Sequence, residues 1–156
     1  MTADSVEYAG FWIRVGASLI DTALVVCVTL PILVAIYGWT YFDASKMGTT
    51  AGFADFLISW VAPAIAIVAF WLYKQATPGK MALSMKVVDA KTGRTLTIGQ
   101  SIGRYLGYFV STIPLGIGLI WVAFDPKRQG WHDKLAGTVV VRSKHRGPEA
   151  VNFDRA

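Results

Sequence analysis

The sequence predicts an all-α membrane protein with two transmembrane helices, a re-entrant or third membrane helix and a small cytoplasmic β-hairpin. Composition is the first observation behind this fold class: 54% of the 156 residues are hydrophobic and 16% are charged, whereas about 25% are charged in a typical soluble domain. The second is that the apolar residues gather in three long runs, and the third is that basic residues gather between and after them. The composition excludes a disordered chain, a coiled coil and an ordinary nucleic-acid-binding domain.

The three apolar runs cover residues 11–38, 53–74 and 102–124. A helix of about 20 apolar residues crosses a bilayer, so each run is long enough to be considered. The first ten residues contain Asp4 and Glu7 instead of the basic start of a signal peptide, and the first run is longer than a signal peptide's apolar region. We therefore expect the first run to remain in the membrane as a helix.

Basic residues are unevenly distributed among the connections. Residues 74–101 contain five, the segment after Asp125 contains seven, and residues 41–52 contain only Lys46. Cytoplasmic connections of membrane proteins carry an excess of Lys and Arg. The pattern predicts a multi-pass protein of the bacterial cytoplasmic (inner) membrane. Its N-terminus, middle connection and C-terminus are expected in the cytoplasm, and its Lys46 loop outside.

The third apolar run must return to the side from which it starts if both basic segments are cytoplasmic. Pro114 removes a helix hydrogen bond in the middle of this run, and Gly116 and Gly118 favour a reversal of the chain. We therefore favour a re-entrant helical hairpin formed by residues 102–113 and 117–124. The alternative is a single kinked helix that crosses the membrane and places the tail outside.

A small β-hairpin is expected in the middle connection. Lys86–Val88 and Leu96–Ile98 are short β-rich runs on either side of a Lys-Thr-Gly turn. Thr138–Arg142 is a further β-branched run that could add a third strand. The resulting organisation is a membrane domain over residues 8–142, followed by a basic, flexible cytoplasmic tail over residues 143–156.

Two charged residues lie inside the first apolar run. Arg14 and Asp21 are two helical turns apart, and Ser18 lies between them on the same face. Charges inside a membrane are costly, so Asp21 needs a partner or a function. Two interpretations stay open: Asp21, with Ser18 beside it, binds a proton or a monovalent cation, or its carboxyl group ties helices together. Arg104, at the start of the third run, either pairs with an acid or faces lipid headgroups.

The segment after the third run combines basic and acidic residues. Lys127, Arg128 and Lys134 are expected at the membrane edge, where attraction to anionic headgroups contributes about 1 kcal/mol per cation. Asp133 stands among these cations, and we expect it to pair with Arg14 and dock this segment beneath the first helix. No group of His, Cys and acidic residues has metal-ligand spacing, so no metal site is predicted.

Four stretches of the sequence resemble the RDD family of small bacterial membrane proteins, which is named for one arginine and two aspartates. They are Ala9-Gly-Phe-Trp-Ile-Arg14 to Asp21, Thr77-Pro-Gly-Lys80 to Asp89, Pro114 to Gly130, and Trp131-His-Asp133 to Val141. The resemblance implies that Arg14 is the family's arginine and Asp21 its first aspartate. It implies Asp133 as the second aspartate, with Asp125 as the competing candidate. Transport has been suggested for the family, and sodium–proton exchange has been attributed to one member.

Two functions of different classes follow from these observations. The first is a transporter of a small solute, a cation or a proton that uses Asp21; two spanning helices are too few to enclose a pathway, so it would act as a homo-oligomer. The alternative is a non-transporting membrane adaptor that binds anionic lipid or a partner protein. A lipid flippase is a third, weaker interpretation. We expect no enzymatic activity, no cofactor and no nucleic-acid partner.

Overall fold

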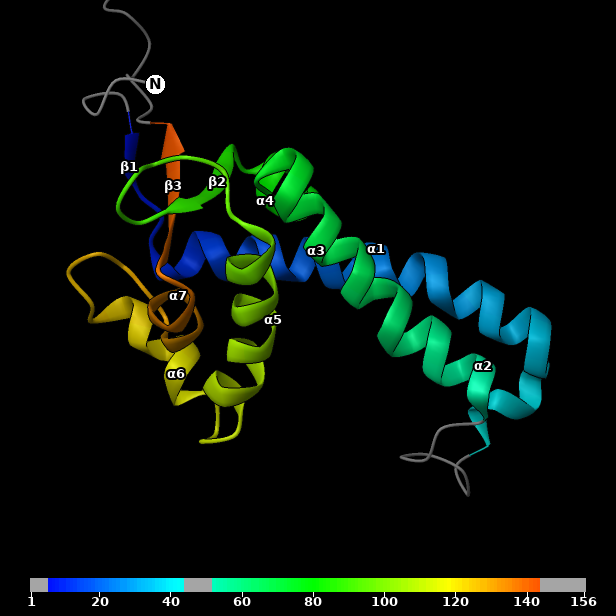
Figure 1. Ribbon diagram of the computed structural model, residues 1–156. Helices are drawn as coiled ribbons and strands as arrows, with labels where there is room; N and C mark the ends of the chain where they lie inside the picture. Colours follow the sequence, from blue (N-terminus) through cyan, green and yellow to red (C-terminus); the bar gives the residue numbers. More distant parts are fainter. Residues whose placement is uncertain (1–5, 44–51, 144–156) are drawn as a thin grey trace, which may run out of the picture.

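The computed structural model describes residues 6–43 and 52–143. The molecule is mostly helical, with two long apolar helices and one small three-stranded sheet (Figure 1). This confirms the predicted fold class. Lys46 lies outside the described residues, and so does all of the predicted tail of residues 143–156 except Ser143.

Among residues 6–43 and 52–143, two helices are long and apolar enough to cross a membrane. The first, α1 (Phe11–Tyr37), ends at Gly38, whose φ of 68° is in the left-handed region that glycine adopts without strain, and a 3-10 turn follows at Trp39–Phe42. The second is one continuous rod made of α2 (Phe53–Phe56), a π-helical turn at Leu57–Val61 and α3 (Ala62–Lys74). Little of the most apolar part of each helix is buried within the isolated chain, as expected where lipid covers it.

The third apolar segment is bent by 114° between two helical pieces. α5 (Ile98–Thr112) precedes a turn, and α6 (Ile117–Ile120) and a 3-10 turn at Trp121–Ala123 follow it. The break lies at Pro114 and Gly116, as predicted, and Gly116 has a φ of 75°. α5 begins four residues earlier than position 102 because Thr97 and Gln100 form a capping box.

Gly118 does not belong to the break. It lies inside α6, where a Cβ atom would stand 2.7 Å from the Cα atom of Ser111 in α5. A contact that short requires a residue without a side chain. The prediction that Gly118 helps to break the helix is therefore wrong, since its role is to let α6 approach α5.

The sheet is antiparallel with the order β1-β3-β2. β1 (Val6–Tyr8) and β2 (Met85–Asp89) pair on either side of β3 (Thr138–Ser143), which includes the predicted third strand. The predicted hairpin between Lys86–Val88 and Leu96–Ile98 is wrong. Thr97 caps α5 and Ile98 is its first residue, so the chain turns into a helix where a second hairpin strand was expected.

The sheet brings together three segments that are far apart in the sequence. One precedes α1, one follows the second long helix, and one follows the bent pair α5–α6. Paired strands cannot be separated by a bilayer, so these segments lie on the same side of any membrane that the two long helices cross. The bent pair then enters and leaves on that side, which supports the re-entrant arrangement over a single kinked span.

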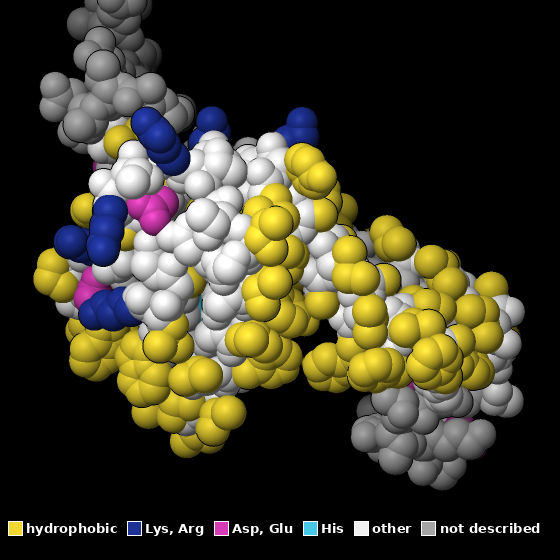
Figure 2. Space-filling model, in the orientation of Figure 1, with side chains coloured by type: hydrophobic (Ala, Val, Ile, Leu, Met, Phe, Trp, Pro, Cys, Tyr) yellow, Lys and Arg dark blue, Asp and Glu magenta, His cyan; other side chains and the backbone are white. Residues whose placement is uncertain are grey.

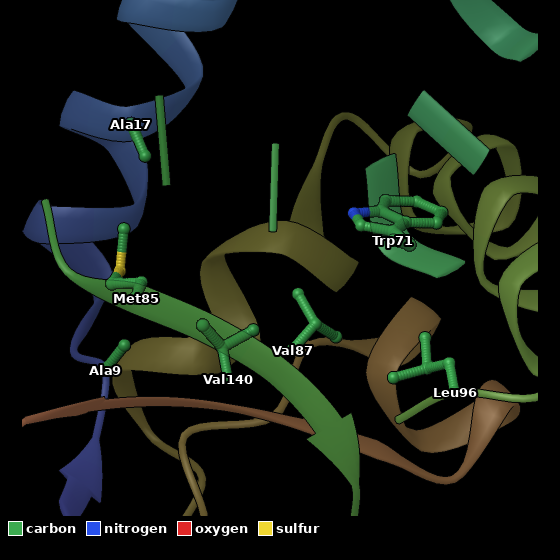
Figure 3. Packing of buried hydrophobic residues seen from close by; sticks show 7 residues of the cluster. All are labelled: Ala9, Ala17, Trp71, Met85, Val87, Leu96 and Val140. Atoms are coloured by element: carbon green, nitrogen blue, oxygen red, sulfur yellow. The ribbon is translucent and has the colours of Figure 1, made fainter. Parts of the chain in front are cut away.

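The hydrophobic core lies where the sheet meets the start of α1 and the end of α3 (Figure 3). Its buried members are Ala9, Ala17, Trp71, Met85, Val87, Leu96 and Val140. Full burial of an aliphatic side chain of this kind contributes about 1.5–3 kcal/mol. Two short helices complete the described chain around this core: α4 (Pro78–Ala82) and α7 (Trp131–Ala136).

Candidate functional site

Asp133 of α7 is the centre of a buried charge network. Its Oδ2 atom lies 2.6 Å from Nη1 of Arg14 in α1, and its Oδ1 atom forms an ion pair with Nη1 of Arg104 in α5. The backbone N–H of Gly130 also donates to Oδ2, at 3.1 Å. One carboxylate therefore joins three helices that are remote in the sequence, and the predicted pair of Arg14 and Asp133 is present in the structure.

Arg14 holds two further parts of the chain in place. Its Nε atom donates to the carbonyl oxygen of Ala9 at 3.0 Å, and its Nη2 atom donates to the carbonyl oxygen of Arg128 at 2.5 Å. The guanidinium of Arg14 therefore connects the turn that contains Arg128, before α7, to the start of α1. This is the docking of the C-terminal segment that the sequence predicts.

Arg104 is completely buried. Of the two environments expected from the sequence, an acid partner or lipid headgroups, the structure shows the acid partner. Besides Asp133, the Nη1 atom of Arg104 donates to Oγ1 of Thr138 at 2.7 Å. Its guanidinium carbon lies 5.2 Å from the ring centre of Trp71 and 5.9 Å from that of Tyr108, which are cation–π distances. Its Nε and Nη2 atoms have no hydrogen-bond partner among the described residues.

His132 completes this cluster, and the sequence analysis did not single it out for this role. Its ring stacks on Tyr108 with 4.0 Å between the centroids. Its backbone N–H donates to Oγ of Ser111 at 3.0 Å, and its Nδ1 atom lies 3.3 Å from the same oxygen. The imidazole ring therefore lies between α5 and the carboxylate of Asp133, with its Nε2 atom 3.5 Å from Oδ1 of Asp133.

Burial acts in opposite directions on the pKa values of the neighbours Asp133 and His132. Burial by itself raises the pKa of Asp133, but the guanidiniums of Arg104 and Arg14 outweigh it and hold that pKa below the ordinary value. Burial lowers the pKa of His132 to about 3, against the opposing effect of the Asp133 carboxylate. At neutral pH the network therefore contains one carboxylate, two guanidiniums and a neutral imidazole.

The neutral His132 predicts a loss of stability in mild acid. An unfolded histidine has a pKa of about 6.5, so below that pH the unfolded chain binds a proton that the folded chain does not bind until about pH 3. Lowering the pH from about 7 to about 5 should reduce the free energy of unfolding by about 2 kcal/mol. The measurement is unfolding in mixed micelles at each pH, and a His132→Gln variant should show a flatter pH dependence. An equal pH dependence in both proteins would contradict a neutral buried imidazole.

Asp21 links α1 to the start of α4. The hydroxyl of Thr77 donates to its Oδ2 atom at 2.5 Å, and the backbone N–H of Gly79 donates to its Oδ1 atom at 2.7 Å. Gly79 lies so close to α1 that a Cβ atom there would stand 2.1 Å from the carbonyl oxygen of Ala17. This is the helix-tying arrangement that the sequence left open as one of two interpretations.

Lys80 is buried beside this contact. Its Nζ atom lies 3.4 Å from Oγ1 of Thr77, and within the described chain it has no carboxylate partner within ion-pair distance. The Thr-Pro-Gly run does carry a helix-start signal, because Thr is a good N-cap residue and Pro fits the first helical position. Nothing in the sequence indicates that Lys80, the next residue, is buried.

The remaining predicted site residues lie in the turn before α7 and in α7 itself. Asp125 accepts from the backbone N–H groups of Lys127 and Gln129, both at 3.1 Å, and pairs with Lys134 at 2.5 Å. It stays local, whereas Asp133 reaches α1, which supports Asp133 as the second aspartate of the family. Lys127 and Arg128 are exposed as expected at a membrane edge, but Lys134 is engaged by Asp125.

Two adjoining open cavities lie beside α1. The first, of about 390 Å³, is called the cationic cavity here, because Arg14, Lys80 and Arg104 all line it, together with His132 and Tyr108. The second, of about 560 Å³, is called the Asp21 cavity. Ser18 lines both, as do Lys80 and Tyr108. In the part of the chain that the structure describes, no three His, Cys, Asp or Glu side chains gather as metal ligands.

The profile of the RDD family matches residues 8–137, a range that includes all three charges of the network and Asp21. The chain belongs to the RDD family. It is 36% identical over 149 residues to Uncharacterized protein YxaI of Bacillus subtilis, covering 85% of this chain and 96% of that protein. It is 32% identical over 146 residues to Uncharacterized membrane protein YteJ of the same organism, covering 88% and 82%.

A third relative of this RDD-family chain is Uncharacterized protein RP437 of Rickettsia prowazekii. It is 37% identical over 114 residues, which cover 70% of this chain and 64% of that protein. No solved structure matches the chain. The comparisons and the apolar helices together make this an RDD-family membrane protein.

Proposed function

We propose that this RDD-family protein is a non-transporting membrane adaptor that binds anionic lipids of the cytoplasmic leaflet. The observation that carries this proposal is a set of exposed cations around the sheet, just outside the apolar surface (Figure 2). They are Lys74, Lys86, Lys91, Arg94, Lys127 and Arg128. None of them forms an ion pair with a described residue.

The acids on the same side of the molecule do not neutralise these cations. Glu7 pairs with Arg142 and Asp125 with Lys134, while Asp133 is buried between two arginines. Asp89 accepts hydrogen bonds from Thr92 in its own turn and from Gln100 of α5, and this one carboxylate does not balance six cations. The exposed surface therefore carries a positive excess, and each cation near an anionic leaflet contributes about 1 kcal/mol of attraction.

Lipid selectivity tests the proposal. In phosphatidylcholine bilayers that contain the protein, a spin-labelled phosphatidylglycerol should associate several-fold more strongly than spin-labelled phosphatidylcholine. The ratio should fall when NaCl rises from about 0.1 M to about 1 M, which shortens the Debye length from about 10 Å to about 3 Å. A Lys127→Gln variant should lower the ratio. Equal association of the two lipids at low salt would contradict the proposal.

Transport by a homo-oligomer through Asp21 is the second candidate. It is supported by the Asp21 cavity, which Asp21, Ser18 and Thr112 line between α1, α3 and α5. Two observations argue against a bound cation: Asp21 already accepts two hydrogen bonds, and the buried Lys80 lines the same cavity. The test is flux in proteoliposomes under an imposed proton or sodium gradient. Flux that Asp21→Asn abolishes without unfolding the protein would favour this candidate over the adaptor.

A further inference from the structure

We propose that the cationic cavity is a binding site for one anionic amphiphile, with its phosphate group at Arg14, Lys80 and Arg104. The ligand is a single anionic phospholipid held from the surrounding leaflet. The proposal rests on the lipid-binding function above for its choice of ligand, and it deepens that function by giving it a defined site. The site is distinct from the exposed cations, since its three cations are buried.

The charges around the cavity do not balance. Arg14, Lys80 and Arg104 line it, and no Asp or Glu among the described residues does. Arg14 and Arg104 share a single carboxylate, that of Asp133, and Lys80 has no described carboxylate within ion-pair distance. Asp21, the next acid, lines the adjoining cavity together with Lys80 and accepts hydrogen bonds from Thr77 and Gly79, so three cations still face only two acids. A buried excess of positive charge is costly, and an anion from outside the chain removes that cost.

Arg104 supplies hydrogen-bond donors as well as charge. Its side chain is fully buried, it lines the cavity, and its Nε and Nη2 atoms lack hydrogen-bond partners within the described residues. Buried donors in folded proteins are normally satisfied. A guanidinium fork matches the oxygen atoms of a phosphate group, and the ammonium of Lys80 adds a third point of charge.

The walls of the cavity indicate that the ligand also has an apolar part. Besides its cations, the cavity is lined by several aliphatic side chains: Val15, Leu19, Leu119, Ile120 and Val122. Its volume of about 390 Å³ is at the lower end for a ligand site and suits a headgroup rather than a whole phospholipid. Leu19 and Ile120 are exposed, at 66% and 47%, so acyl chains could continue along the lipid-facing surface of α1 and α6.

Native mass spectrometry of the detergent-purified full chain tests the site. Wild-type protein washed in about 0.5 M NaCl, which screens surface charges, should retain one phosphatidylglycerol per chain. Lys80→Gln should lower the retained fraction about tenfold through loss of a charged contact. Arg142→Gln, which also removes one cation but at a residue that pairs with Glu7 and does not line the cavity, should retain the lipid. Equal retention in Lys80→Gln and wild type would overturn the site while leaving the spin-label selectivity of the surface intact.

Two further experiments test whether lipid loss comes from the cavity rather than from unfolding, and whether the ligand is a lipid or a free phosphate. Leu119→Trp fills the cavity without removing a charge, so it should also lose the lipid while its unfolding transition stays close to that of wild type. Retention in a folded Leu119→Trp variant would overturn the proposal. Inorganic phosphate should fail to displace the lipid; displacement at equal concentration would show that a free phosphate is the ligand and would overturn the lipid as its source.

Discussion

Replacing Asp133 by Asn should lower the free energy of unfolding by about 3–5 kcal/mol, the range measured when one partner of a buried ion pair is removed. The substitution keeps the size of the side chain but removes its charge. Arg14 and Arg104 would then remain buried without a counter-charge, because Asp133 is the acid that both of them contact. The measurement is reversible unfolding in mixed micelles, followed by tryptophan fluorescence.

Asp125→Asn is the matched control for this prediction. Asp125 is also an acid of the same polar segment, but its partner Lys134 is partly exposed, at 44% of its side chain. Only Asp125 of this pair is buried, and Asn keeps an oxygen that can accept from the backbone N–H groups of Lys127 and Gln129, so Asp125→Asn should cost less than Asp133→Asn. Equal losses in the two variants would mean that the buried network does not stabilise the fold more than a half-exposed pair.

Gly79→Ala should have the second largest effect, a loss of about 3 kcal/mol or more from overpacking. The added Cβ atom would stand 2.1 Å from the carbonyl oxygen of Ala17 and 2.9 Å from Cγ of Asp21. The nearest obstacle is backbone, so α4 would have to move away from α1 and would weaken both hydrogen bonds to Asp21. Thermal unfolding monitored by circular dichroism measures the loss.

Gly103→Ala provides the control for a glycine in a helix. Gly103 lies in α5, and nothing stands within 4 Å of the position of its Cβ atom. Alanine has the higher helix propensity, so this variant should be neutral or more stable by up to about 1 kcal/mol. If both glycine variants behave alike, the close approach of α4 to α1 is not a determinant of stability.

Hydropathy and charge pattern were enough to predict the membrane part of the fold. The two spanning helices follow from runs of the required length, and Pro114 with Gly116 marks the bend of the third segment. Charge opposition also predicted the long-range pair of Arg14 and Asp133, because an isolated acid among cations and an arginine inside an apolar run each need a partner. These features depend on local composition or on strong electrostatic requirements.

The errors arose where pairing is set by the whole fold. The run at Leu96–Ile98 has strand-forming residues, but the Thr97 capping box makes it the start of a helix, a signal that was readable in the sequence. β2 instead pairs with β3, a strand from the far end of the described chain. The burial of Lys80 and the stacking of His132 on Tyr108 come from the packing of helices, and no spacing in the sequence encodes them.

A double-mutant cycle between Arg14 and Asp133 tests the central claim most directly, namely that a buried carboxylate couples the first membrane helix to the C-terminal segment. Arg14→Gln, Asp133→Asn and the double variant would be unfolded under identical conditions. We expect the cost of the double variant to fall short of the sum of the two single costs by about 2 kcal/mol or more, as for residues in direct contact. Costs that add to within about 0.5 kcal/mol would show that the two residues act independently and would contradict the claim.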